Sequence, residues 1–152
     1  MKYMIFQILL IIICSCSSIN DEVQEPEFAD VKKVEVRGDE NAYQFSVTLK
    51  SPDTGCDQYA DWWEVISSDG ELIYRRILAH SHVDEQPFSR SGGSVNIAKN
   101  QQVWVRAHMN NTGYGGLVMK GSVDAGFQIT PWPDAFAEGV EKVEPLPAGC
   151  AF

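Results

Sequence analysis

The sequence predicts an all-β fold, and three observations carry that prediction. Apolar and polar side chains alternate from Tyr43 to Lys50, which is the period of a strand with one buried face. Turn-forming segments such as Asp69-Gly70 recur about every 8 to 12 residues. The 152 residues include 12 glycines, 7 prolines and 44% apolar side chains, a composition typical of a folded chain with many turns. The length suits one domain with a sizeable core.

The first 15 residues read as a signal peptide. Lys2 supplies a positive charge, and Ile5 to Ile13 is almost unbroken apolar sequence, too short to cross a bilayer as a helix. The segment Ile13-Cys14-Ser15-Cys16 resembles the processing box of bacterial lipoproteins. This resemblance implies that Cys16 is lipidated and becomes the new N-terminus. The alternative is an ordinary signal peptide cleaved near Ser17 or Ser18.

Residues 16–30 are polar and acidic and show no periodicity, so we expect a lipidated flexible tether. The protein would then be an exported, membrane-anchored lipoprotein of the cell envelope, at the outer membrane or facing the periplasm. A formal net charge of -9 repels phosphate backbones, and we expect no nucleic-acid partner. An envelope protein or a glycan remains as the expected partner.

The folded body is expected over residues 31–130. Residues 31–51 should form a hairpin whose turn contains Arg37-Gly38-Asp39. Asp69-Gly70 should connect a second pair of strands, and residues 87–93 should be irregular because Pro87 and a Ser-Gly-Gly run lie there. The expected strands after the first hairpin are residues 59–66, 71–78, 95–97, 103–108 and 117–123.

About seven short strands with a tryptophan on the third resemble an immunoglobulin or fibronectin type III domain. That resemblance implies an antiparallel sandwich. Residues 131–152 should form a tail packed on the sandwich, with a short helix that Pro133 opens. Phe136, Val140 and Val143 would share one face of this helix.

Two cysteines remain in the body once Cys16 carries lipid. Cys56 and Cys150 should form a disulfide bond, because an exported chain is exposed to oxidising conditions. Closing a loop of this length should stabilise the fold by about 4 to 5 kcal/mol. The alternative is two separate thiols.

All three histidines lie near expected strand ends and suggest a metal site. His80 and His82 should point the same way on an extended chain, and His108 is followed by Met109. Imidazole and thioether groups suit copper, and imidazole suits zinc. The chain would in that case be a copper- or zinc-binding envelope protein. The alternative is histidines that hydrogen-bond an ordered loop.

Aromatic residues offer a second candidate site. Adjacent Trp62 and Trp63 should face opposite sides of a strand, one in the core and one nearer solvent. With Trp104, Tyr114 and Trp132, the outer ring could bind a sugar or a protein partner. The alternative is that the C-terminal tail covers these rings.

One buried charge pair is also expected. Arg75 and Arg76 should face opposite sides of their strand, and the packed guanidinium should find Glu64 or a tryptophan ring.

Signals for catalysis are weak. Ser81 lies between two histidines without the glycines of a nucleophile elbow, and carboxylates are scattered over turns. We therefore predict a non-catalytic, lipid-anchored binding or assembly module of the cell envelope. Its binding residues would be Trp62, Trp63, Trp104 and Tyr114.

Overall fold

The computed structural model describes residues 27–151. The expected signal peptide (1–15), the lipidation site Cys16 and most of the tether lie outside the described residues.

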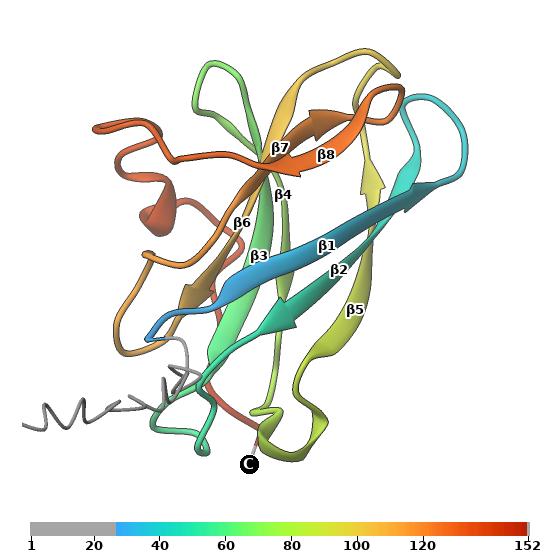
Figure 1. Ribbon diagram of the computed structural model, residues 1–152. Helices are drawn as coiled ribbons and strands as arrows, with labels where there is room; N and C mark the ends of the chain where they lie inside the picture. Colours follow the sequence, from blue (N-terminus) through green and yellow to red (C-terminus); the bar gives the residue numbers. More distant parts are fainter. Residues whose placement is uncertain (1–26, 152) are drawn as a thin grey trace, which may run out of the picture.

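The described chain forms two antiparallel sheets (Figure 1). The first contains β1 (Asp30–Arg37), β2 (Tyr43–Lys50) and β5 (Phe88–Val95), in the order β1-β2-β5. The second has the order β4-β3-β6-β7-β8. Its strands are β3 (Ala60–Ser67), β4 (Leu72–Ile77), β6 (Val103–Met109), β7 (Met119–Ser122) and β8 (Gly126–Ile129). The expected all-β, antiparallel architecture is confirmed.

Both hairpins follow from their turn residues. β1 pairs with β2, and Val36 lies opposite Phe45. Gly38 in the connecting turn has a φ of 101°, a conformation that glycine adopts without steric cost. Gly70 plays the same part between β3 and β4, with a φ of 87°. The expected turns at residues 37–41 and 67–70 are both confirmed.

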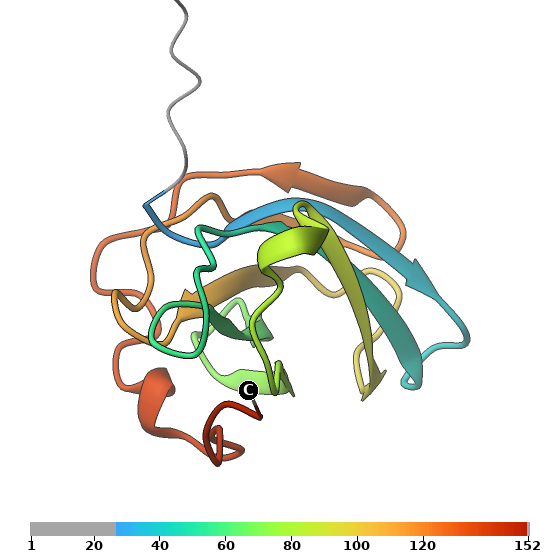
Figure 2. The same cartoon turned by 90° about the horizontal axis from the view of Figure 1, so that it is seen from below.

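The main core lies between the two sheets (Figure 2). Inward residues alternate along each strand, so Trp63 and Val65 on β3 meet Val103 and Val105 on β6 in the same apolar layer. The remaining buried members are Ala29, Val31, Tyr43, Phe45, Val47, Leu49, Ala60, Leu78, Phe88, Val95, Ile97, Ala107 and Met109. The outer face of the second sheet, which points away from this core, is not covered by the first sheet.

The C-terminal segment covers that outer face, as Figure 2 shows for the chain after β8. Trp104 packs against Trp132 and Phe136, with ring centroids 5.3 and 5.7 Å away. Ile66, Val118 and Val140 are the other buried members of this second cluster. A disulfide bond joins Cys56 to Cys150, as the sequence predicted.

Three strand expectations need correction. The short strand expected at 95–97 is absent, because β5 ends at Val95 and the next two residues belong to no strand. Residues 88–95 form β5, a full strand paired with β2, where an irregular passage was expected. The glycine at position 92 suggested a loop, but the strand needs it for space. A Cβ there would lie 2.6 Å from the hydroxyl of Tyr74 and 3.1 Å from the ring of Trp63. β8 was not expected from the sequence, since only Phe127 and Ile129 alternate in a four-residue strand.

The expected C-terminal helix is wrong. The segment forms turns and one three-residue 3-10 helix, η2 (Val140–Lys142); another, η1 (Val83–Glu85), follows β4. Ala135, Ala137 and Gly139 all have positive φ values, which interrupt a right-handed helix. Phe136 and Val140 still pack inward, as expected, whereas Val143 is exposed.

No helix among the described residues is long and apolar enough to cross a membrane.

Candidate binding site

Three charged side chains form a row across the outer face of the second sheet. On β3, Glu64 lies opposite Arg75 of β4 and opposite Arg106 of β6. Arg75 Nη2 lies 2.6 Å from Glu64 Oε2, and Arg106 Nε lies 2.7 Å from Glu64 Oε1. All three residues are buried. One carboxylate thus separates two buried guanidinium groups.

Arg75 has all its nitrogens engaged. Its Nε and Nη2 both donate to Glu64 Oε2. Its Nη1 donates to the carbonyl oxygens of Val143 and Pro145, and its Nη2 also donates to that of Val140. Its guanidinium carbon also lies 4.5 Å from the centre of the Trp62 ring. Both partners proposed from the sequence, Glu64 and a tryptophan, are confirmed, and Arg75 holds the C-terminal segment to the sheet.

Arg106 has far fewer partners. Its guanidinium carbon lies 3.6 Å from the ring centre of Tyr114 and 4.3 Å from that of Trp132. Its Nε bonds Glu64, but its buried Nη2 has no hydrogen-bond partner in the described part of the chain. An unpaired donor at a site with only 4% exposure costs free energy unless something else satisfies it.

Tyr114 completes the polar network. Its hydroxyl donates to Glu64 Oε1 at 2.7 Å and accepts a hydrogen bond from Trp62 Nε1 at 3.3 Å. Burial raises the pKa of Tyr114, and the negative charge of Glu64 raises it further. The phenol therefore stays protonated and serves as a neutral donor.

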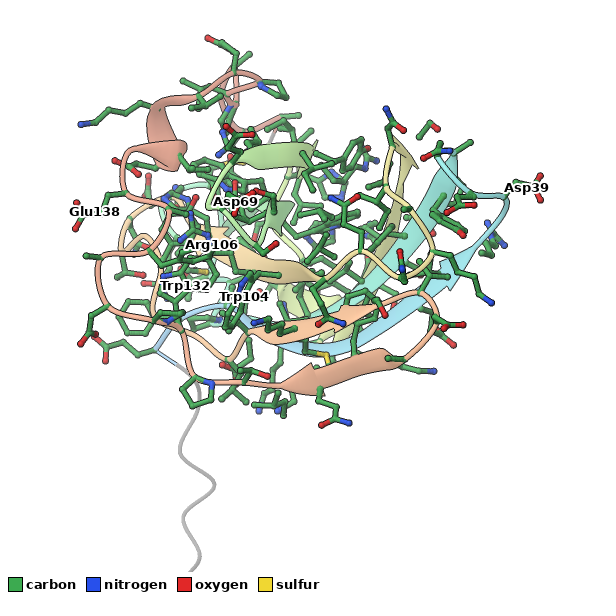
Figure 3. The ribbon with its side chains drawn as sticks, turned by 90° about the horizontal axis from the view of Figure 1, so that it is seen from above. Asp39, Asp69, Trp104, Arg106, Trp132 and Glu138 are labelled. Atoms are coloured by element: carbon green, nitrogen blue, oxygen red, sulfur yellow. A yellow bond between two sulfur atoms is a disulfide. The ribbon has the colours of Figure 1, made fainter. Side chains whose placement is uncertain are left out.

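A cavity of about 150 Å³ lies beside Arg106. Its lining residues are Arg106, Ala107, Tyr114, Gly115, Gly116, Val118 and Trp132. Figure 3 shows Arg106, Trp132 and Trp104 gathered on one side of the molecule, far from the turn that carries Asp39. Arg106 comes from β6, Tyr114 and the glycines from the loop after it, and Trp132 from the C-terminal segment.

The two glycines at the cavity fix the position of its loop. A Cβ on Gly115 would lie 2.7 Å from the ring of Phe28, and one on Gly116 would lie 2.6 Å from the carbonyl carbon of Ala29. The backbone N–H of Leu117 donates to Asp30 Oδ1 at 2.7 Å. The start of the described chain thus supports the wall of the cavity, and this explains why the loop carries glycines.

Three of the four residues expected to form an aromatic platform are buried. Trp63 faces the main core and is wholly buried, while Trp62 and Trp104 on the other face are each only 4% exposed. Trp62 stacks on His108 and Trp104 packs under the C-terminal segment, so neither ring presents a surface to solvent. Of the expected binding residues, Tyr114 alone lines the cavity.

The three histidines expected to bind copper or zinc have different surroundings in the structure. His108 Nδ1 lies 2.7 Å from Asp61 Oδ1, and its ring stacks on Trp62 at 3.7 Å. His80 and His82 do lie together, with ring centroids 4.6 Å apart, but their surroundings differ from those of His108. Within residues 27–151, no three His, Cys, Asp or Glu side chains are placed to hold a metal ion.

His82 is instead part of a buried cluster at one end of the sandwich. Its ring stacks on Phe88 at 3.9 Å, and its backbone N–H donates to Asp53 Oδ2 at 2.8 Å. Neither ring nitrogen has a hydrogen-bond partner among the described residues. Burial lowers the pKa of His82, and the positive charge of Arg90 lowers it further. The ring is therefore held in its neutral form.

Sequence reasoning missed Arg106 as a site residue. The alternation of Val103, Val105 and Ala107 with Trp104 and Arg106 placed this arginine on the face away from the core. Strand alternation shows on which face of the sheet Arg106 lies. It does not show that Arg106 has no acidic partner of its own, which depends on how the sheet is assembled.

Comparison with known proteins adds one relative. The chain is similar to a protein of Halomicrobium mukohataei. The two are 36% identical over 123 residues, which is 78% of this chain. The relative carries the name "Putative lipoprotein", and the chain spans 59% of its length. No protein-family profile matches the chain, and no solved structure matches it.

Proposed function

We propose that this protein is an exported, lipid-anchored module of the cell envelope that binds a ligand and catalyses no reaction. The observation that carries the binding role is the cavity beside Arg106, where a buried cation with an unpaired donor meets two aromatic rings. Ligand sites are typically concave and largely apolar with a few placed polar groups. The cavity has this character.

The lipid anchor is supported by two independent features. The segment ending at Cys16 has the form of a lipoprotein processing box, and the relative from Halomicrobium mukohataei is named as a lipoprotein. We propose attachment to the membrane through acyl chains on Cys16, at the outer membrane or facing the periplasm. Envelope proteins and glycans are the proposed classes of partner.

The fold type belongs to the same proposal. Immunoglobulin-type domains place strands A, B and E in one sheet and C, F and G in the other, with C′ beside C in the variable type. The orders β1-β2-β5 and β4-β3-β6-β7 correspond to A-B-E and C′-C-F-G. This correspondence supports an immunoglobulin- or fibronectin-like sandwich, with β8 as an addition.

The anchor is tested by expressing the full-length chain in a bacterial host fed an alkyne-bearing fatty acid. We expect the Cys16→Ala variant to lose the fatty-acid label and to leave the membrane fraction. The Cys14→Ala variant should keep both the label and its place in the membrane fraction. Labelling that persists in Cys16→Ala would contradict the proposed anchor site.

The binding role is tested by ligand-observed NMR on the exported chain in dodecyl maltoside, against neutral, cationic and anionic fragments. We expect some fragments to bind, and Trp132→Ala to weaken that binding because Trp132 lines the cavity. Leu146→Ala is the matched control, since this exposed residue lies in the same C-terminal segment. If no fragment of any class binds, the binding role fails.

A further inference from the structure

We infer that the cavity binds a carboxylate group carried on a small apolar body. This inference rests on the binding role proposed above and adds the chemical class of the ligand. Four features of the site lead to it: its charge, its free donors, its size and its lining.

The charge of the site calls for an anion. Glu64 is the acidic side chain that both Arg75 and Arg106 contact, so the buried row has two positive charges against one negative charge. The other groups around Arg106 are the neutral phenol of Tyr114 and the indole of Trp132. A buried charge is costly unless it is paired, and a ligand with one negative charge would balance this row.

The two arginines of the row differ in how they are used. Arg75 makes five hydrogen bonds that involve all three of its nitrogens. Arg106 makes one, through Nε, although it is as deeply buried. Its buried Nη2 has no hydrogen-bond partner among the described residues. Nη1 and Nη2 form the end of the side chain, beyond the Nε that bonds Glu64. This edge of a guanidinium matches the two oxygens of a carboxylate in a bidentate pair.

The cavity limits the body of the ligand. Its volume of about 150 Å³ is that of a cavity able to hold benzene. The walls are rings, Val118, Ala107 and glycine backbone, and Arg106 is the charged group of the lining. A body rich in hydroxyls would find few partners there, whereas an apolar ring or short chain would fit.

The test compares ligands that differ only in charge. Titrations of the exported chain in dodecyl maltoside, followed by tryptophan fluorescence, would use benzoate, the isosteric neutral benzamide, and inorganic phosphate. We expect benzoate to bind at least tenfold more tightly than benzamide and than phosphate. Equal binding of benzoate and benzamide would overturn the inference yet leave the binding role standing, while no binding of any probe would count against both.

A variant pair assigns the effect to Arg106. Arg106→Lys keeps the positive charge but removes the paired donors, and should weaken benzoate binding at least tenfold. Arg76→Lys is the control, because Arg76 is an exposed arginine on β4. Undiminished binding in Arg106→Lys would overturn the inference. If that variant does not fold, the comparison of benzoate with benzamide decides alone.

The carboxylate could belong to a free organic acid or to the end of a peptide chain. A tripeptide ending in Phe, tested as free acid and as amide, separates these sources. Preference for the free-acid tripeptide over benzoate would indicate a chain terminus, and preference for benzoate would indicate a small organic acid. Both outcomes support a carboxylate ligand, and equal binding of the acid and amide tripeptides would count against it.

Discussion

Arg75 Nη2 lies 2.6 Å from Glu64 Oε2, and both side chains are completely buried on the outer face of the second sheet. The same arginine donates to three carbonyl oxygens of the C-terminal segment. The pair therefore connects the sheet to the segment that covers it. Its burial also makes the carboxylate of Glu64 essential, because two guanidinium groups depend on it.

Glu64→Gln should lower the free energy of unfolding by about 3 to 5 kcal/mol, since it leaves Arg75 and Arg106 buried without a counter-charge. Urea unfolding followed by tryptophan fluorescence would measure this loss. Glu85→Gln is the matched control, because Glu85 pairs with Arg90 at the surface and should change stability little. A loss at Glu64 no larger than at Glu85 would contradict the role assigned to the buried row.

Replacing both Cys56 and Cys150 by Ser should lower the free energy of unfolding by about 4 to 5 kcal/mol, because the bridge closes a long loop in the unfolded chain. The 94-residue separation of the two cysteines sets this expectation. Urea unfolding of the double variant gives the value, and the wild-type chain in dithiothreitol provides an independent measure. Identical unfolding midpoints with and without the disulfide would contradict the expected stabilisation.

The buried histidine should make stability depend on pH. Because the folded-state pKa of His82 lies below 6.5, the unfolded chain binds a proton more readily than the folded chain does. Stability is then complete above about pH 6.5 and is lost as pH falls from there through the folded-state pKa. The positive charges of Arg90 and His80 lower the pKa of His82 in addition to burial, whereas the negative charges of Asp53 and Glu85 raise it.

His82→Phe should remove much of that dependence, since a phenyl ring can stack on Phe88 without titrating. Unfolding free energies measured between pH 5 and pH 7.5 would fall less on acidification in the variant than in the wild type. Leu146→Ala, at an exposed position of the C-terminal segment, is the control and should behave like the wild type. Parallel pH curves for His82→Phe and the wild type would show that another group is responsible.

Gly116→Ala should lower the free energy of unfolding by about 1 to 3 kcal/mol, the usual cost of overpacking. The added Cβ would collide with the backbone of Ala29, which cannot rotate away as a side chain can. Thr112→Ala, at an exposed position of the same loop, is the control. Thermal unfolding of both variants provides the comparison, and equal midpoints would mean that the N-terminal segment is not packed on this loop.

Local patterns predicted much of the fold correctly. The alternation from Tyr43 to Lys50 and the Gly-Asp and Asp-Gly turns gave the two hairpins, because strand period and turn geometry depend on neighbouring residues. β5 was missed since its glycines weaken the strand pattern, and what they accommodate, Tyr74 and Trp63, is distant in sequence. The C-terminal helix failed because spacing of apolar residues alone does not reveal positive φ values at Ala135 and Ala137.

The candidate site was predicted only in part. Pairing of Arg75 with Glu64 followed from strand alternation and the cost of burying a charge, and it is confirmed. The expected histidine site and aromatic platform each depended on a long-range arrangement of side chains, which the sequence does not contain. His108 finds Asp61 as its partner, and the tail covers Trp104.

The sequence by itself determined the β class, the main turns, the cysteine pair and the alternation of faces along strands such as Tyr43–Lys50. These depend on local geometry and on the presence of two cysteines in the body. Only the tertiary structure decided that Arg106 shares one carboxylate with Arg75 and faces a cavity between Tyr114 and Trp132. The physical reason is that charge balance and cavity shape arise from side chains that meet only after the sheets and the C-terminal segment are packed.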